Sequence, residues 1–194
     1  MEDISMHILD VTENSLTAGA SKIFIWLLED MAEDTLTLEI VDDGSGMKEE
    51  LLRKVISPFT TTRTTRKIGL GLPYLAQSAE SAGGELMVKS DPGIGTRIVA
   101  TFKLSHIDRI PIGNLCETIL TLIICHPKVH FFFSYEKDNQ VFSFSTNMIR
   151  KELEGIPLSH SEVIGGLRSM IQEGLDQIGV ATPVPSKARK RINR

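Results

Sequence analysis

The sequence predicts an α+β two-layer sandwich, a mixed β-sheet covered on one face by helices, with a C-terminal α/β extension. Apolar residues recur at helical spacing over residues 3–17, while residues 22–28 and 35–41 alternate in the manner of half-buried strands. Helical and strand patterns then follow one another to about residue 178. This order of elements indicates one sheet layer packed against one helix layer.

Helices and strands of the first half are separated by short polar turns. We expect helices at 3–17, 48–55 and 71–82, and strands at 22–28, 35–41, 85–90 and 96–104. The segments EDMAED and DPGIG have the polar and glycine-rich composition of turns between paired strands. We therefore assign residues 1–104 to one domain.

The residue composition changes beyond residue 104, where we expect an apolar helix and a phenylalanine-rich hairpin. The predicted elements are helices at 112–125, 147–154 and 160–178, and strands at 129–135 and 140–146 around a KDN turn. The hairpin either extends the edge of the sheet or forms a separate small layer. Residues 105–180 are assigned to a C-terminal α/β extension packed on the first domain, and residues 181–194 to a disordered basic tail.

Composition and charge exclude several classes of protein. Hydrophobic residues make up 41% and charged residues 24% of the chain, an ordinary globular balance. No apolar run approaches the roughly 20 residues that span a bilayer, and the N-terminal residues do not resemble a signal peptide. We expect a cytoplasmic protein without a membrane partner. The net charge is −4 although the tail is basic, so nucleic acid is not an expected partner.

The chain has two cysteines, Cys116 and Cys125, nine residues apart in an apolar helical stretch. Two cysteines make neither a disulfide framework nor a zinc pattern. We expect both to be buried free thiols.

The first predicted helix carries a polar stripe that includes His7, Asp10 and Asn14. His7 can orient the Asp10 carboxylate; the alternative, which we expect, is a surface histidine. Residues four apart lie on one helix face. An amide oxygen is a suitable magnesium ligand, and a carboxylate one turn earlier can orient or deprotonate a water or hydroxyl. The pairing is also what any amphipathic helix shows, and by itself it does not decide the chemistry.

Two glycine-bearing loops come next, DDGSGM after a strand and GIGT before one. In the first, Asp42 can accept a hydrogen bond from the amino group of a flat base, and Gly44 and Gly46 let the backbone approach it. Met47 ends the loop, and Thr96 of the second loop can reach the same base. A plain turn remains the alternative for each loop.

A third motif, KIGLGL, precedes a helix whose exposed N–H groups favour an anion such as phosphate. The candidate contacts are Lys67, Gly69, Leu70, Gly71 and Leu72. The threonine- and arginine-rich run at 57–68, which includes Thr61 and Arg63, lacks apolar anchors. We expect it to be a lid that is mobile without ligand and ordered by a triphosphate.

Together these motifs resemble the four nucleotide-binding boxes of the superfamily of histidine kinases, mismatch-repair ATPases, gyrase and the large heat-shock chaperones. The likeness is carried by LDVTENSLTAGA, DDGSGM, SPFTTTR with IGLGL, and SDPGIGTRIVATF, and it covers residues 4 to 102. It implies the Bergerat ATP-binding fold of the histidine-kinase-like (GHKL) ATPases, with ATP and Mg²⁺ as ligands.

The resemblance also implies roles for particular residues. Asn14 would hold Mg²⁺ and Asp10 would be the catalytic base, although that position is usually glutamate in active members. Lys67 replaces the first glycine of the usual phosphate motif, where it either contacts phosphate or is merely exposed. The remaining implied contacts are Asp42 to the adenine amino group, Gly44 and Gly46 around the base, Gly69 and Gly71 at the phosphates, and Thr96 at the adenine end.

Over its whole length the chain resembles small stand-alone ATP-binding proteins of anaerobic bacteria, through phrases such as MHILDVTENS and SHIDRIPIGNLCETILTLI. No helical hairpin with a phosphoacceptor histidine precedes the first helix, so we expect a stand-alone kinase-like ATPase in signalling. It would phosphorylate an unidentified protein in trans or hydrolyse ATP slowly. The alternative is an ATP-sensing module that binds ATP and ADP with little turnover.

Overall fold

A computed structural model describes residues 3–56 and 71–180 of the chain. The predicted lid at 57–68 and the predicted basic tail at 181–194 fall outside the described residues.

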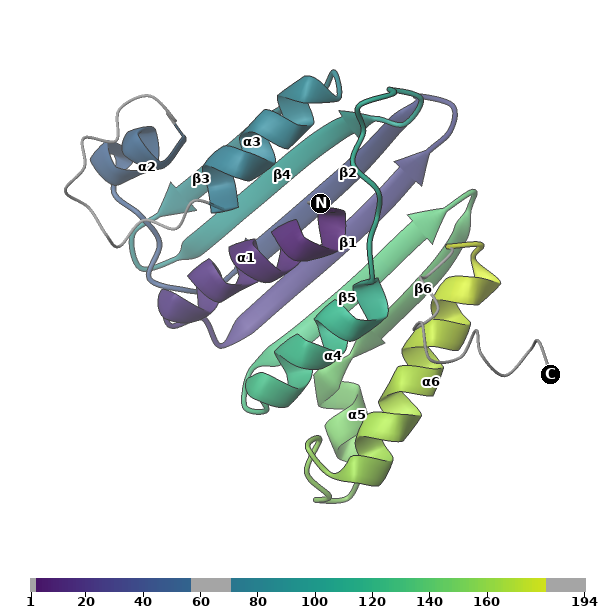
Figure 1. The fold of residues 1–194 in the computed structure, drawn as a ribbon. Helices are drawn as coiled ribbons and strands as arrows, with labels where there is room; N and C mark the ends of the chain where they lie inside the picture. The colour runs from purple at the N-terminus through teal and green to yellow at the C-terminus, as the bar shows by residue number, and fades with distance from the viewer. Residues whose placement is uncertain (1–2, 57–70, 181–194) are drawn as a thin grey trace.

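The described residues form one mixed six-stranded sheet with helices on one face, as predicted (Figure 1). Its strand order is β3-β4-β2-β1-β5-β6, and every neighbouring pair is antiparallel except β1 and β5. The helices are α1 (Ile4–Thr17), α2 (Glu49–Ile56), α3 (Gly71–Ser81), α4 (Leu115–Cys125), α5 (Thr146–Glu152) and α6 (Ser161–Gln177). The strands are β1 (Lys22–Asp30), β2 (Thr35–Asp42), β3 (Leu86–Asp91), β4 (Gly95–Lys103), β5 (His130–Lys137) and β6 (Gln140–Ser145).

Helix α1 begins where Asp3 caps it and where the later chain supplies two further acceptors. The Asp3 carboxylate accepts a hydrogen bond from the Met6 backbone N–H at 2.9 Å. The N–H groups of Ile4 and Ser5, which have no partner inside a helix, donate to the carbonyls of Pro111 and Ile112, each at 2.9 Å. The N-terminus of α1 is therefore held by the segment that joins the two halves of the chain.

Strand periodicity decides which side chains enter the core. In β2 every second residue is buried from Leu36 to Asp42, and the half-buried residues between them face the other side of the sheet. The core lies between the sheet and the helices. Strand β1 runs two residues beyond its predicted end at Leu28, because pairing with β2 continues to Asp30 opposite Thr35.

The phenylalanine-rich hairpin extends the sheet at its edge, the first of the two arrangements that the sequence left open. Strand β5 lies parallel to β1, with Phe132 opposite Phe24, and β6 is the outer strand. Phe131, Phe133 and Tyr135 enter the core beneath the helices, and each is at most 2% exposed. Burial of these rings holds the hairpin on the sheet.

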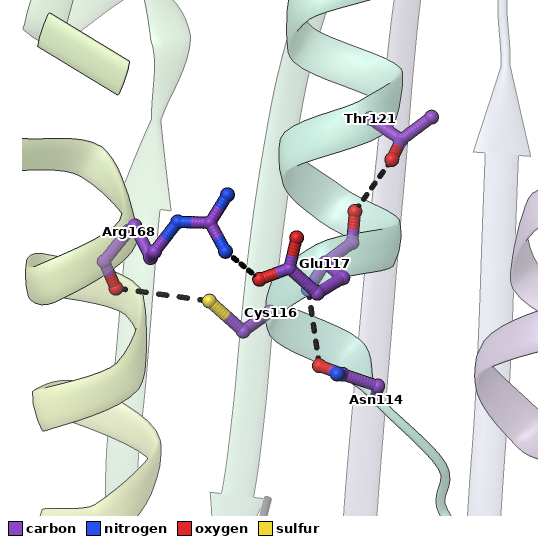
Figure 2. Close-up of polar contacts among 5 residues, drawn as sticks. All are labelled: Asn114, Cys116, Glu117, Thr121 and Arg168. Carbon is purple, nitrogen blue, oxygen red and sulfur yellow. Dashed lines mark hydrogen bonds and ion pairs between the residues drawn. The ribbon is translucent and has the colours of Figure 1, made fainter. Parts of the chain in front are cut away.

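Helix α4 starts three residues later than predicted. Asn114 caps it by accepting a hydrogen bond from the Glu117 backbone N–H at 3.1 Å, and Gly113 before it has a φ of 80°. Glu117 in turn forms an ion pair with Arg168 of α6, and the Cys116 thiol lies 3.7 Å from the Arg168 carbonyl oxygen (Figure 2). These contacts pack α6 against α4.

The expectation for the two cysteines is half wrong. Cys116 is buried, and burial raises the pKa of its thiol to about 11. Cys125 is exposed, because it is the last residue of α4 and faces away from the core.

In the part of the chain that the structure describes, no helix has the length and apolarity needed to cross a membrane.

Candidate functional site

A cavity of about 230 Å³ opens between α1, the end of β2, α2 and the start of α3. Six of the residues singled out in the sequence line it: Asn14, Asp42, Gly46, Met47, Leu72 and Thr96. Apolar side chains complete the wall: Val11, Leu51, Val55 and Ile98. The cavity thus combines a mostly apolar lining with a few polar groups, as small-molecule sites do.

Asp42 lies in this cavity because of strand periodicity. It is the last residue of β2, and the alternation of that strand turns its side chain toward the helices. Thr96 is its direct partner on β4, and opposite residues of antiparallel strands share a face. The two residues, 54 positions apart in the sequence, therefore meet at the same end of the sheet.

The Asp42 carboxylate is 7% exposed and is held by two donors. The Ser15 hydroxyl donates to Oδ2 at 2.5 Å, and the Gly44 backbone N–H donates to Oδ1 at 2.9 Å. A carboxylate oxygen has two lone-pair directions. Asp42 is therefore oriented by the protein and can still accept a hydrogen bond from a molecule in the cavity.

The neighbouring Asp43 has a different, structural role. Its carboxylate accepts hydrogen bonds from the backbone N–H groups of Ser21 and Lys22, at 2.7 and 2.8 Å, and from the Ser21 hydroxyl at 2.7 Å. Partial burial raises the pKa of Asp43, but these hydrogen bonds outweigh it and hold the pKa below its ordinary value. Asp43 thus ties the loop to the start of β1.

The glycines of the loop allow close backbone packing. Gly46 has a φ of 62°, and a Cβ there would lie 2.0 Å from the Asp91 carbonyl oxygen. A Cβ at Gly44 would lie 2.9 Å from Oδ1 of Asp42. No other residue fits at Gly46 without moving the backbone.

Ser90 joins the loop to the Thr96 strand. Its hydroxyl accepts a hydrogen bond from the Met47 backbone N–H at 2.8 Å, donates to the Gly95 carbonyl at 3.1 Å, and lies 2.9 Å from the Thr96 hydroxyl oxygen. These bonds hold the Met47 backbone and the Thr96 side chain close together at the cavity wall.

Asp10 and Asn14 lie where α1 meets the beginning of α3. A Cβ at Gly71, the first residue of α3, would lie 3.0 Å from the Asp10 Cβ and 3.7 Å from the Asn14 amide nitrogen. Asp10 is exposed and Asn14 is half-buried. The polar stripe of α1 therefore faces the N-terminus of the helix that follows the glycine motif.

His7 belongs to the same stripe, but the expectation of a surface histidine is wrong. The ring is 2% exposed, and its Nε2 lies 3.1 Å from the Ser78 hydroxyl oxygen of α3. Packing of α3 alongside α1 buries it (Figure 1).

Five predicted contacts lie outside the described residues: Thr61, Arg63, Lys67, Gly69 and Leu70. Sequence reasoning missed Ser15 and Ser90. Ser15 had a signal, because it is a polar residue on the apolar stripe formed by Ile8 and Val11 at helical spacing. Ser90 had no such signal, because nothing in the sequence distinguishes it from other serines on strands.

Comparison with known proteins gives a family match for the half of the chain that contains this cavity. The family model for the histidine kinase-, DNA gyrase B-, and HSP90-like ATPases matches residues 2–106. Sporulation kinase E of Bacillus subtilis is 36% identical over 90 residues, which are 45% of this chain and 12% of that protein. The autoinducer 2 sensor kinase/phosphatase LuxQ of Vibrio cholerae is 31% identical over 96 residues, 47% of this chain and 11% of that protein.

The chain thus spans about a tenth of the length of these two relatives. Among solved structures, the N-terminal domain of a DNA repair protein matches 74% of this chain and 52% of that chain, with a TM-score of 0.50 and 13% identity. At that identity the match shows a shared fold alone.

Proposed function

The chain belongs to the family of histidine kinase-, DNA gyrase B- and HSP90-like ATPases, and from this premise we propose that it is a Mg-ATP-dependent, kinase-like signalling ATPase. It contains an ATP-binding kinase-like domain. The proposed activity is transfer of the terminal phosphoryl group to another protein, or slow hydrolysis of ATP. The observation that carries the proposal is the approach of Asp10 and Asn14 to Gly71, beside the cavity that contains Asp42.

The adenine end of the proposed site is the cavity itself. Asp42 would accept a hydrogen bond from the adenine amino group, while Val11, Met47 and Ile98 would contact the ring. The volume of about 230 Å³ is below the roughly 300–1,000 Å³ of most small-molecule sites. The described residues would therefore enclose the base rather than the entire nucleotide.

The phosphate end of the proposed site lies at the junction of α1 and α3. The first N–H groups of a helix have no partner inside it and favour an anion, and Gly71 begins α3. The half-buried amide of Asn14 fits the oxygen ligands that Mg²⁺ takes, and Mg²⁺ would supply charge neutralisation there. Asp10, one turn earlier, would accept the proton of the attacking water or acceptor hydroxyl or imidazole.

We further propose that residues 105–180 brace the ATP-binding unit at residues 1–104 and act with it as one stand-alone unit. The joining segment caps α1 through Pro111 and Ile112, and the His126 ring lies 3.3 Å from the Glu13 carboxylate. Glu13 directly precedes Asn14. The extension thus contacts α1 at both ends, so it would limit movement of the residues proposed to act on the phosphates.

A specific observation favours a second candidate, an ATP-sensing module with little turnover. Asp10 is exposed, whereas burial and neighbouring charges usually set the reactivity of a catalytic carboxylate. It is also one methylene shorter than glutamate. Both features fit a residue that holds a water molecule without removing its proton.

Three variants of α1 distinguish these functions. Asp10→Asn should keep nucleotide binding but lose about 100- to 10,000-fold in turnover, the usual cost of removing a general base. Asn14→Ala should lose the magnesium dependence of ATP binding. Glu13→Gln is the matched control, because it makes the same carboxylate-to-amide change on α1 and keeps a side-chain oxygen for the contact with the His126 ring.

The assays are calorimetry with ATP and ADP, with and without Mg²⁺, and steady-state ATP hydrolysis. Equal turnover in wild type and Asp10→Asn would contradict the proposed base. Intact ATP binding with no turnover or phosphoryl transfer in wild type would favour the sensing module.

A further inference from the structure

Helices α1 and α3 lie side by side in opposite directions, and two of their contacts involve the polar stripe of α1 (Figure 1). At the first contact, Gly71 lies so close to α1 that a Cβ there would be 3.7 Å from the Asn14 amide nitrogen. At the second, the His7 Nε2 lies 3.1 Å from the Ser78 hydroxyl oxygen. A later residue of α3 thus meets an earlier residue of α1.

These two contacts are equally spaced on both helices. Asn14 and His7 are seven residues apart on α1, and Gly71 and Ser78 are seven residues apart on α3. Seven residues make almost two helical turns, so each pair lies on one face of its helix, about 10 Å apart along the axis. The His7–Ser78 contact and the approach of Gly71 to Asn14 therefore belong to one axial alignment of the two helices.

The His7–Ser78 contact can fix this alignment in a way that apolar packing cannot. The other buried residues of α3 are a glycine and four apolar residues: Gly71, Leu72, Leu75, Ala76 and Ala79. Apolar contact is non-directional, so it resists separation of two helices more than a small slide. A hydrogen bond needs a particular distance and direction. The His7 ring is 2% exposed, and buried polar groups are held by such bonds.

We propose that His7 is a positioning residue for the phosphate end of the site. Through Ser78 it aligns α3 with α1, so that the first N–H groups of α3 face the phosphates beside Asn14. The helix rise is about 1.5 Å per residue, whereas N–H···O distances lie within about 2.7–3.2 Å. A slide of one residue would therefore break the bonds from α3 to a phosphate. The inference rests on the proposed function and adds to it a residue that touches neither nucleotide nor metal.

The adenine end does not depend on this contact. Asp42 is held by the Ser15 hydroxyl of α1 and by the Gly44 backbone N–H. Helix α3 contributes Leu72 to the cavity wall, and this apolar contact tolerates a small shift. Loss of the hydrogen bond between α1 and α3 should therefore weaken binding of the phosphates and spare binding of adenosine. A general loss of structure would weaken both.

Ser78→Ala is the first test, because it removes the hydroxyl and leaves the His7 ring in place. Calorimetry with Mg²⁺ should show an ATP affinity about tenfold lower and an adenosine affinity within about twofold of wild type, as expected for one hydrogen bond. Ser78→Thr keeps a hydroxyl and should bind ATP as wild type does. Ser81→Ala is the matched control, because it makes the same change at an exposed position of α3.

His7→Leu tests the other partner of the contact. Leucine is similar in size to histidine but forms no side-chain hydrogen bond, so the ATP affinity should fall at least as far as in Ser78→Ala. The adenosine affinity should again stay near that of wild type. The double variant should lose no more than His7→Leu alone, because either change removes the contact. Thermal unfolding of each variant without nucleotide checks that it is folded.

Two outcomes would overturn the inference and leave the proposed function intact. One is wild-type affinity for ATP in both Ser78→Ala and His7→Leu. The other is a parallel loss of ATP and adenosine affinity, which would make the contact purely structural. A wild-type protein that binds adenosine as tightly as Mg-ATP would contradict the proposed phosphate end itself, and the role of His7 with it.

Discussion

Replacing Asp42 by Asn should cost most of the affinity for adenine nucleotides while leaving the fold intact. In wild type, Asp42 is oriented by the Ser15 hydroxyl and the Gly44 N–H, which would leave a carboxylate lone pair for the adenine amino group. In the variant, the amide oxygen can still accept from Gly44, and its NH₂ can donate to Ser15. The apo protein therefore keeps its internal hydrogen bonds.

The loss falls on the bound state. An NH₂ group cannot accept from the adenine amino group, so the complex loses a hydrogen bond to a charged acceptor. Such a bond is worth about 1.5–3 kcal/mol, which corresponds to roughly 10- to 150-fold in Kd. The same NH₂ can donate to the carbonyl oxygen of guanine. The preference for ATP over GTP should therefore narrow or reverse.

Calorimetric titration of ATP and GTP into wild type, Asp42→Asn and Asp43→Asn measures this directly. Asp43→Asn is the matched control, because it is the same substitution one residue later. In the described structure the Asp43 carboxylate forms hydrogen bonds only with Ser21 and Lys22. Asp43→Asn should bind ATP normally. The reasoning is refuted if Asp42→Asn binds ATP within twofold of wild type, or if Asp43→Asn loses the affinity instead.

Three further expectations follow from single residues. Gly46→Ala should lower the stability of the protein to denaturant by more than Gly93→Ala. Both glycines have positive φ, but a new Cβ at Gly46 would lie 2.0 Å from a carbonyl oxygen, whereas nothing lies within 4 Å at Gly93. Equal losses of stability would contradict this prediction. Asp43 has a lowered pKa, so its stabilisation should be complete above the ordinary aspartate pKa of about 3.9 and lost as the pH falls through the folded-state value; Asp43→Asn should flatten the acid limb of the unfolding curve. A thiol reagent should modify Cys125 in the native protein and reach Cys116 only on unfolding, because burial raises the Cys116 pKa to about 11; two fast native thiols would refute it.

Short-range patterns predicted which of the candidate site residues lie close together. The end of a strand followed by DDGSGM placed Asp42, Gly46 and Met47 at one loop, and the structure has all three on the cavity wall. Helical spacing placed Asp10 and Asn14 on one side of α1, where both approach Gly71. These predictions rested on residues within a few turns or one loop of each other, where backbone geometry alone sets which side chains are neighbours.

The sequence could not predict contacts that depend on how whole elements pack. Ser15 was overlooked, although its apolar neighbours at helical spacing marked it, because its partner Asp42 lies 27 residues away. His7 looked like a surface residue until α3 was placed beside α1. The position of the hairpin was equally undetermined, since both of its faces carry phenylalanine.

The sequence by itself determined the periods of the helices and strands and the loops that join them, because each is governed by interactions between residues close together in the chain. Only the tertiary structure decided that β5 lies parallel to β1. Because of this pairing, Phe131 and Phe133 lie in the core, while Phe132 lies with Trp26 on the face of the sheet away from the helices. The reason is that a strand can satisfy its hydrogen bonds beside any free edge, and the choice of edge is made by the area that both of its faces bury after the other elements have assembled.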